Sequence, residues 1–135
     1  INLMSMITAS QDAARHMIEQ GSGRIINISS VHGIVHMPGH AIYAATKGGI
    51  NGFTRSLAVE LAPHQVTCNV IAPGAIQVDR YKAQNLEPRA VGAHIPMRRV
   101  GQPAEIAAAV AYLASDEASY ISGQSWAVDG GYTML

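Results

Sequence analysis

The sequence has few charged residues and almost no cysteine, and each shortage excludes a class of protein. Its one cysteine, Cys68, cannot form a disulfide within the chain, so a reducing compartment such as the cytoplasm is the expected location. Charged residues make up 13% of the chain, and nine basic side chains balance nine acidic ones. No basic stretch offers an electrostatic surface to a nucleic acid, and no apolar run reaches the roughly 18 residues of a membrane span. We therefore expect neither a nucleic-acid partner nor a membrane-spanning segment.

The residues that are abundant are apolar. Hydrophobic residues fill 48% of the 135 positions, which suits one packed domain and is too apolar for a disordered chain. The chain opens on Ile1-Asn2-Leu3-Met4, without an initiator methionine or a signal-peptide pattern. We therefore expect residues 1–135 to be a single domain fragment of a longer protein.

Apolar periodicity and glycine or proline breaks predict three helices that alternate with three short apolar strands. The expected helices cover residues 3–20, 41–62 and 104–114, and the expected strands cover 24–28, 66–72 and 125–128. Residues 75–100 are irregular and polar, with a short helix possible near 79–86. Strands that alternate with helices indicate an α/β fold with a parallel sheet.

Tyr43 and Lys47 stand four residues apart on the helix expected at 41–62, which puts both side chains on one face. A phenol is ordinarily too weak an acid to trade its proton at neutral pH, and a nearby ammonium stabilises the phenolate. Such a tyrosine can act as an acid toward a carbonyl or as a base toward an alcohol. Ser30 follows the strand expected at 24–28, at the edge where parallel sheets gather catalytic groups. The alternative for Tyr43 and Lys47 is a solvated surface pair without a catalytic role. The alternative for Ser30 is a serine that only forms the turn after the strand.

Five segments, in order along the chain, together resemble the short-chain dehydrogenase/reductase family. They are Asn27-Ile28-Ser29-Ser30, Tyr43-Ala44-Ala45-Thr46-Lys47, Asn69-Val70-Ile71-Ala72-Pro73-Gly74, Gly101-Gln102-Pro103-Ala104-Glu105-Ile106-Ala107 and Asp129-Gly130-Gly131. The resemblance covers essentially the whole chain. It implies the C-terminal half of a Rossmann-type, doubly wound parallel sheet, on the catalytic and substrate side of an NAD(P)-binding domain.

The resemblance also implies roles for individual residues. Tyr43 matches the proton-transferring tyrosine, Lys47 the lysine that assists it and binds the nicotinamide ribose, and Ser30 the serine that orients the substrate oxygen. Asn2 falls where the family has the asparagine of a proton relay, with a helix cap as the alternative. The segment that lines the nicotinamide of NAD or NADP matches Pro73, Gly74, Ile76 and Val78. The implied reaction is hydride transfer between NAD(P) and a carbonyl or secondary alcohol.

Two departures from the family pattern affect the cofactor. No G-x-x-x-G-x-G segment occurs, so the first βαβ unit, whose glycine-rich turn binds the pyrophosphate, is absent and the choice between NAD and NADP stays open. Val78 stands where the family usually has threonine, which leaves only backbone contacts there. We expect the isolated fragment to be inactive. The alternative is a non-catalytic remnant that serves as an oligomerisation module.

Six histidines raise the question of a metal site. His32, His36 and His40 stand four apart, but Gly33, Pro38 and Gly39 make a helix there implausible, so we expect no metal. His32 and His94 are instead expected to line the substrate pocket, with solvated loop histidines as the alternative.

The substrate is expected to be sugar-, polyol- or oxoacyl-like. The motifs are similar to those of glucose 1-dehydrogenases and, nearly as much, to those of oxoacyl-carrier-protein reductases within the family. The family also implies a homo-oligomer, a tetramer or a dimer. A free edge along residues 24–28 would make residues 1–135 alone marginally stable or prone to associate.

Overall fold

The computed structural model describes residues 2–79, 81 and 87–134, with the side chain of Asn2 outside the description. The helices are α1 (Asn2–Gln20), α2 (Ala41–Leu61), α4 (Pro88–Gly92) and α5 (Pro103–Ala114), and the strands are β1 (Gly23–Ile28), β2 (Val66–Pro73) and β3 (Ser125–Val128). Four single turns of 3₁₀ helix join them: η1 (Val31–Gly33), η2 (Ala62–His64), η3 (Asp116–Ala118) and η4 (Tyr132–Met134).

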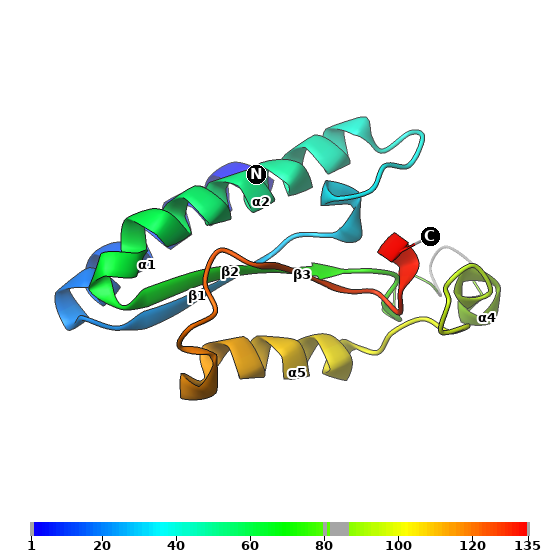
Figure 1. The fold of residues 1–135 in the computed structure, drawn as a ribbon. Helices are drawn as coiled ribbons and strands as arrows, with labels where there is room; N and C mark the ends of the chain where they lie inside the picture. Colours follow the sequence, from blue (N-terminus) through cyan, green and yellow to red (C-terminus); the bar gives the residue numbers. More distant parts are fainter. Residues whose placement is uncertain (1, 80, 82–86, 135) are drawn as a thin grey trace.

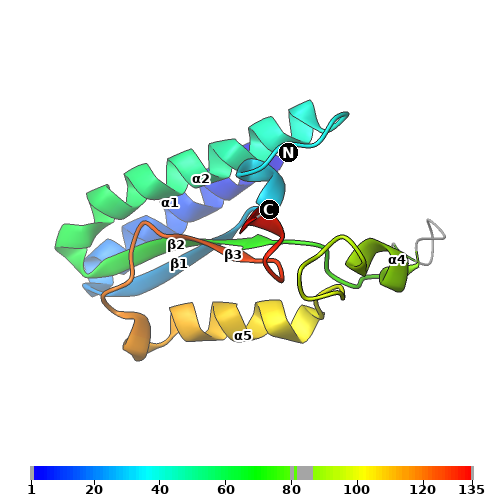
Figure 2. The same ribbon diagram turned by 45° about the vertical axis from the view of Figure 1, so that its right-hand side comes forward.

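The three strands form one parallel sheet in the order β1-β2-β3. Helices α1 and α2 lie side by side over one face of the sheet, and α5 covers the other face (Figures 1 and 2). The central strand is buried from Val66 to Ala72, as expected for a strand covered on both faces. The predicted α/β class and its parallel sheet are confirmed.

Each face of the sheet has its own apolar core. On the α1–α2 side, Leu57 and Leu61 of α2 pack with Ile25 and Cys68 of the sheet. On the α5 side, Leu113 packs with Ile71 and Ala118. Burial raises the pKa of the Cys68 thiol to about 12, so this cysteine is an unreactive core residue.

Local signals set the ends of the main elements. Gly21 adopts φ +74° after α1, and the Ser22 N–H donates to the Met17 carbonyl, as at many helix C-termini. Pro103 begins α5, where its missing N–H costs no helical hydrogen bond. All six predicted elements therefore appear with ends within about two residues of expectation, a normal margin.

The short elements were not predicted. They are the four 3₁₀ turns and α4, which lies within the segment expected to be irregular. The short helix that the sequence suggested near 79–86 falls mainly outside the described residues, although Tyr81 is described and buried. Within the described part of the chain, no helix has the length and apolar character needed to cross a membrane.

The carboxyl ends of the strands share one end of the molecule. The chain leaving β1 through η1, the helix α4 and the C-terminal η4 turn gather at this end (Figures 1 and 2). Parallel sheets place their binding sites at this edge, because the loops that follow the strands meet there.

Candidate active site

Tyr43 and Lys47 lie one turn apart at the start of α2. The Lys47 ammonium is 5.7 Å from the centre of the Tyr43 ring. It also donates a hydrogen bond of 3.1 Å to the carbonyl of Ile28, the last residue of β1. The Tyr43 side chain is 39% exposed, so its phenol remains accessible. A cation anchored to the sheet therefore lies beside an accessible phenol, as the sequence spacing predicted.

The two serines that follow β1 make different contacts, Ser29 with α2 and Ser30 with η1. Ser29 donates a 2.9 Å hydrogen bond from its hydroxyl to the backbone carbonyl of Lys47. Ser30 caps the η1 turn, because its hydroxyl oxygen accepts the His32 backbone N–H at 3.2 Å. A hydroxyl that accepts one hydrogen bond keeps its own proton to donate. Ser30 is only 7% exposed, and Ser29 rather than Ser30 lines the cavity described below.

Gly33 and Asn51 hold η1 against α2, and sequence reasoning missed both. A Cβ atom on Gly33 would lie 2.8 Å from the backbone carbon of Lys47, so only glycine fits there without a shift. The buried Asn51 donates from Nδ2 to the Gly33 carbonyl at 3.1 Å. A glycine three residues after Ser30 could have indicated a tight turn. Its packing partner, Lys47, could not be found from sequence because it lies in another element.

A cavity of about 900 Å³ opens beside Tyr43 and Lys47. Its wall brings together nearly all the predicted site residues that the structure describes, with Ser30 just outside the lining set. The predicted residues in the wall are His32, Tyr43, Lys47, Pro73, Gly74, Ile76, Val78 and His94. Apolar side chains from β1, η1, α4, the loop after α4 and α5 fill much of the remaining lining, among them Ile28, Val31, Val91, Ile95 and Ile106. A volume of this size suits a substrate together with part of a cofactor.

The residues at the end of β2 and just after it fit the nicotinamide end of a dinucleotide. Pro73 and Ile76 give the cavity an apolar wall suited to a flat ring, and Lys47 adds a hydrogen-bond donor in the same cavity. Val78 is 47% exposed and has no hydroxyl to offer. Packing also requires a glycine at position 74. A Cβ there would lie 2.8 Å from the Cα of Asp129, the residue that follows β3.

Three aromatic rings cluster at one end of this cavity. The His32 and His40 rings stack with centres 5.3 Å apart, and the His32 ring meets the Tyr43 ring edge-on at 6.2 Å. Burial lowers the pKa of His32, and the neighbouring His40 lowers it further, while hydrogen bonding to the Val35 backbone partly opposes both effects. The net effect favours the neutral form of the His32 ring.

His94 reaches the cavity from the loop after α4 and is exposed. Asn2 is the first residue of α1, but the position of its side chain lies outside the described residues. Among the residues that the structure describes, no three histidine, cysteine or acidic side chains come together in a manner suited to a metal ion.

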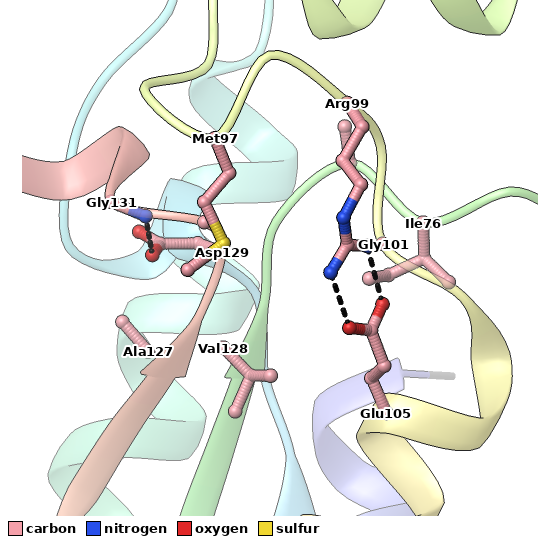
Figure 3. Close-up of a pocket in the computed structure, with 11 residues that line it drawn as sticks. Ile76, Met97, Arg99, Gly101, Glu105, Ala127, Val128, Asp129 and Gly131 are labelled. Carbon is pink, nitrogen blue, oxygen red and sulfur yellow. Dashed lines mark hydrogen bonds and ion pairs between the residues drawn. The ribbon is translucent and has the colours of Figure 1, made fainter.

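A smaller cavity of about 360 Å³ adjoins the loop before α5 (Figure 3). Its charged groups already have partners: Arg99 forms two hydrogen bonds with Glu105, and Asp129 accepts the backbone N–H groups of Gly131 and Thr133. The Arg99 contact holds the pKa of Glu105 at about 2. These pairs fix the loop and the chain end, whereas Tyr43 and Lys47 line the larger cavity.

Comparison with known proteins agrees with this geometry. Residues 1–133 match the protein family described as Enoyl-(Acyl carrier protein) reductase. The 3-oxoacyl-(acyl-carrier-protein) reductase FabG of Vibrio cholerae serotype O1 is 48% identical over 135 residues, which cover 99% of this chain and 55% of that protein. The chain spans about half the length of the curated relatives it matches.

Two solved structures have the same fold over the full chain. A short-chain type dehydrogenase/reductase from Mycobacterium marinum superposes with a TM-score of 0.91 at 34% identity, covering 99% of this chain and 54% of that one. A gluconate 5-dehydrogenase from Burkholderia cenocepacia, in complex with NADP and tartrate, superposes with a TM-score of 0.93 at 34% identity, covering 100% of this chain and 54% of that one.

Proposed function

Because this chain belongs to the short-chain dehydrogenase/reductase family, we propose that the protein is an oxidoreductase that moves a hydride between NAD(P) and a carbonyl or secondary alcohol carbon. The observation that carries the proposal is the pairing of an accessible Tyr43 phenol with the anchored Lys47 ammonium, both in the wall of one large cavity. The matching relatives are about twice as long, so the activity is proposed for the protein at its full natural length.

The proposed reduction divides into a hydride and a proton. When bound, NAD(P)H supplies the hydride and its two electrons to the carbonyl carbon and leaves as NAD(P)⁺. Tyr43 gives its phenolic proton to the carbonyl oxygen as the C–H bond forms, which completes the alcohol. The Lys47 ammonium stabilises the phenolate that remains until solvent returns a proton. Oxidation of the alcohol runs the same steps backwards, with the phenolate as the base.

Further residues are assigned supporting roles in this proposal. Ser30 donates its free hydroxyl proton to the substrate oxygen and so orients it. Asn2 takes part in the return of the proton to Tyr43, together with Lys47. The nicotinamide ring is contacted by Pro73, Gly74, Ile76 and Val78. The substrate is contacted by His32 and His94. Their shared position in or beside the Tyr43 cavity supports these assignments, except for Asn2, which rests on the family pattern alone.

Both NAD and NADP remain candidate cofactors. The NADP complex of the gluconate 5-dehydrogenase supports the second. In a Rossmann fold the residue that selects between them follows the second strand of the first half, and that position has no counterpart in this chain. The names of the relatives support oxoacyl-like and sugar-derived substrates alike.

The proposed function is tested by removing the phenolic hydroxyl. In the full-length protein, Tyr43→Phe is expected to lower kcat by at least about 100-fold, the usual contribution of a general acid. Tyr120→Phe is the matched control, because Tyr120 is fully exposed at 102% and lies outside the cavity lining. Retained turnover in Tyr43→Phe, with NADH and NADPH both tried, would refute the catalytic role.

Self-association is proposed alongside catalysis, as a dimer or a tetramer. Large apolar side chains remain exposed on α1 and α2, namely Met4 at 64%, Ile42 at 84% and Val59 at 76%. Exposed apolar groups on neighbouring helices favour contact with a second copy. If the full-length protein associates but causes no change in NADH or NADPH fluorescence, the alternative of a non-catalytic oligomerisation module is favoured.

The single buried Cys68 supports a cytoplasmic location.

A further inference from the structure

Lys47 of α2 is held at both ends by the chain that leaves β1. Its ammonium donates to the carbonyl of Ile28, the last residue of the strand, at 3.1 Å. Its backbone carbonyl accepts the hydroxyl of the next residue, Ser29, at 2.9 Å. Two consecutive residues at the end of β1 therefore bind the tip of the lysine side chain and the backbone from which that side chain starts.

Ser29 is itself fixed to the centre of the sheet. Its backbone N–H donates to the carbonyl of Ile71 in the central strand β2 at 2.8 Å, and the residue is only 4% exposed. Gly33 packs against the same Lys47 peptide group that accepts the Ser29 hydroxyl, without space for a Cβ. A hydroxyl held in this way sets the distance between α2 and the end of β1 at the position of Lys47.

This distance matters for the ammonium of Lys47. A lysine stem is flexible, and holding it in one conformation costs conformational entropy. The hydrogen bond to Ile28 forms only while α2 lies close enough to β1 for the stem to span the gap. Electrostatic stabilisation weakens with distance, so an ammonium that leaves its place 5.7 Å from the centre of the Tyr43 ring stabilises the phenolate less.

We infer that Ser29 is a positioning residue, whose hydroxyl holds Lys47 so that the ammonium stays beside Tyr43. The inference rests on the proposed oxidoreductase function and gives Ser29 a different task from Ser30, whose hydroxyl is proposed to orient the substrate. Ser29 lines the cavity, but its one hydroxyl proton is already donated to the Lys47 carbonyl, so none is left for a substrate oxygen. Ser29 therefore acts through Lys47 and not on the substrate.

The first experiment measures this anchoring directly, without nucleotide or substrate. In the full-length protein, the rate at which acetic anhydride acylates Lys47 is followed by mass spectrometry of the peptide that contains it. Ser29→Ala is expected to raise this rate by about threefold or more, because the ammonium leaves its hydrogen bond to Ile28 more often. Ser115→Ala is the matched control. Ser115 likewise donates its hydroxyl to a helix carbonyl, that of Tyr112 in α5, and lies outside the cavity lining.

The second experiment tests whether Ser29 affects turnover only through Lys47. An acetoacetyl thioester and dihydroxyacetone serve as carbonyl probes, with NADH and NADPH in turn. Ser29→Ala is expected to lower kcat by about tenfold. In the background of Lys47→Met, which keeps an unbranched stem without the charge, the same substitution should change kcat by less than about twofold, because the group that Ser29 positions is gone. Ser29→Thr retains a hydroxyl and should restore both kcat and the slow acylation of Lys47.

The outcomes separate this inference from the proposed function. Acylation of Lys47 that is no faster in Ser29→Ala than in Ser115→Ala overturns the inference, whatever the activity of the protein. A loss of kcat that persists in the Lys47→Met background also overturns it, since Ser29 would then act independently of Lys47. If Lys47→Met is too slow to measure, recovery of kcat in Ser29→Thr supports the inference and its absence overturns it. No turnover of either probe by the unmodified protein contradicts the proposed function, and the acylation rates still decide the role of Ser29.

Discussion

At the scale of single residues, Gly33 packs against the backbone of α2 with no room for a side chain. We predict that Gly33→Ala destabilises the folded protein by about 1–3 kcal/mol, the range for overpacking a tight contact. The new Cβ would meet the backbone of Lys47 at 2.8–2.9 Å, and backbone atoms cannot move aside as a side-chain tip can. Because the displaced residue is Lys47, turnover should also fall. Denaturant unfolding and steady-state kinetics of the full-length protein measure the two effects.

Gly52→Ala is the matched control for this prediction. Gly52 lies in the middle of α2, and a Cβ there meets no atom within 4 Å. Alanine is the better helix former, so this variant should gain about 0.5–1 kcal/mol without loss of turnover. Equal stability of Gly33→Ala and the unmodified protein would show that η1 moves easily away from the Lys47 backbone.

Residue identities in the site were more predictable than residue contacts. Tyr43 and Lys47 could be found from sequence, because helical periodicity alone places them on one face. The support that Asn51 of α2 gives to η1 could not be found in this way, because it depends on where another segment lies. Local spacing predicts neighbours along one helix, and only the tertiary structure supplies the rest.

At the scale of elements, a buried polar chain connects α1, β1 and α2. Asn27 of β1 donates from Nδ2 to the Thr54 hydroxyl at 3.0 Å and accepts the Ser10 hydroxyl at 3.3 Å. All three residues are buried, with at most 7% of their surface exposed. We predict that Asn27→Ala costs about 1–3 kcal/mol, because it leaves two buried hydroxyls without this partner.

A double-mutant cycle with Thr54→Val isolates the bond between α2 and β1. The coupling between the two substitutions should be about 0.5–1.5 kcal/mol, measured by denaturant unfolding. Valine matches threonine in shape, so the cycle removes the hydroxyl with little change in packing. Strictly additive effects would mean that the Asn27–Thr54 contact does not hold the two elements together.

The start of α5 is fixed by charge, and its contribution should depend on pH. Glu105 accepts two hydrogen bonds from Arg99 and one from the Gln102 N–H, and the Arg99 contact is the main reason that its pKa falls from 4.5 to about 2. A carboxyl whose folded-state pKa lies below its unfolded value stabilises the fold above the unfolded value. That stabilisation is lost as the pH falls through the folded one.

Glu105→Gln should therefore lower stability at neutral pH and have progressively less effect as the pH falls from about 5 toward about 2. Both partners are well exposed, so the effect is modest and screened by salt. The measurement is the difference in denaturation midpoint between the two proteins at several pH values. A difference that is constant with pH would show that the carboxylate charge has no part in anchoring α5.

Regular elements were predictable because their signals are local. Periodic apolar residues and the breaks at Gly21 and Pro103 were sufficient to place the main helices and strands. The five-residue helix α4 could not be predicted in this way, since a helix of one turn is too short to show periodicity. Its residue Val91 instead packs with Tyr81 and Ile95, a small cluster formed only in the folded chain.

At the scale of the whole molecule, the sheet order determines which strands have a free edge. The order β1-β2-β3 leaves the outer edges of β1 and β3 without a paired strand among the described residues, and β1 is the longer of the two. This strand carries Ile25, Ile26 and Ile28, and Ile28 is 44% exposed. An apolar, β-branched edge is a template for pairing with another chain, so a polypeptide of residues 1–135 alone should associate or be marginally stable.

Sedimentation and denaturant unfolding of that polypeptide test the prediction, and two variants locate the cause. Ile28→Glu puts a charge on the β1 edge, close to the Lys47 ammonium, and should reduce association because charged edge strands resist pairing. Ile42→Glu removes an apolar group from the exposed face of α2 instead, and should have less effect. If only Ile42→Glu separates the copies, the helix face and not the strand edge is responsible. A monomer that unfolds cooperatively with a stability above about 5 kcal/mol would show that the three-stranded sheet needs no neighbour.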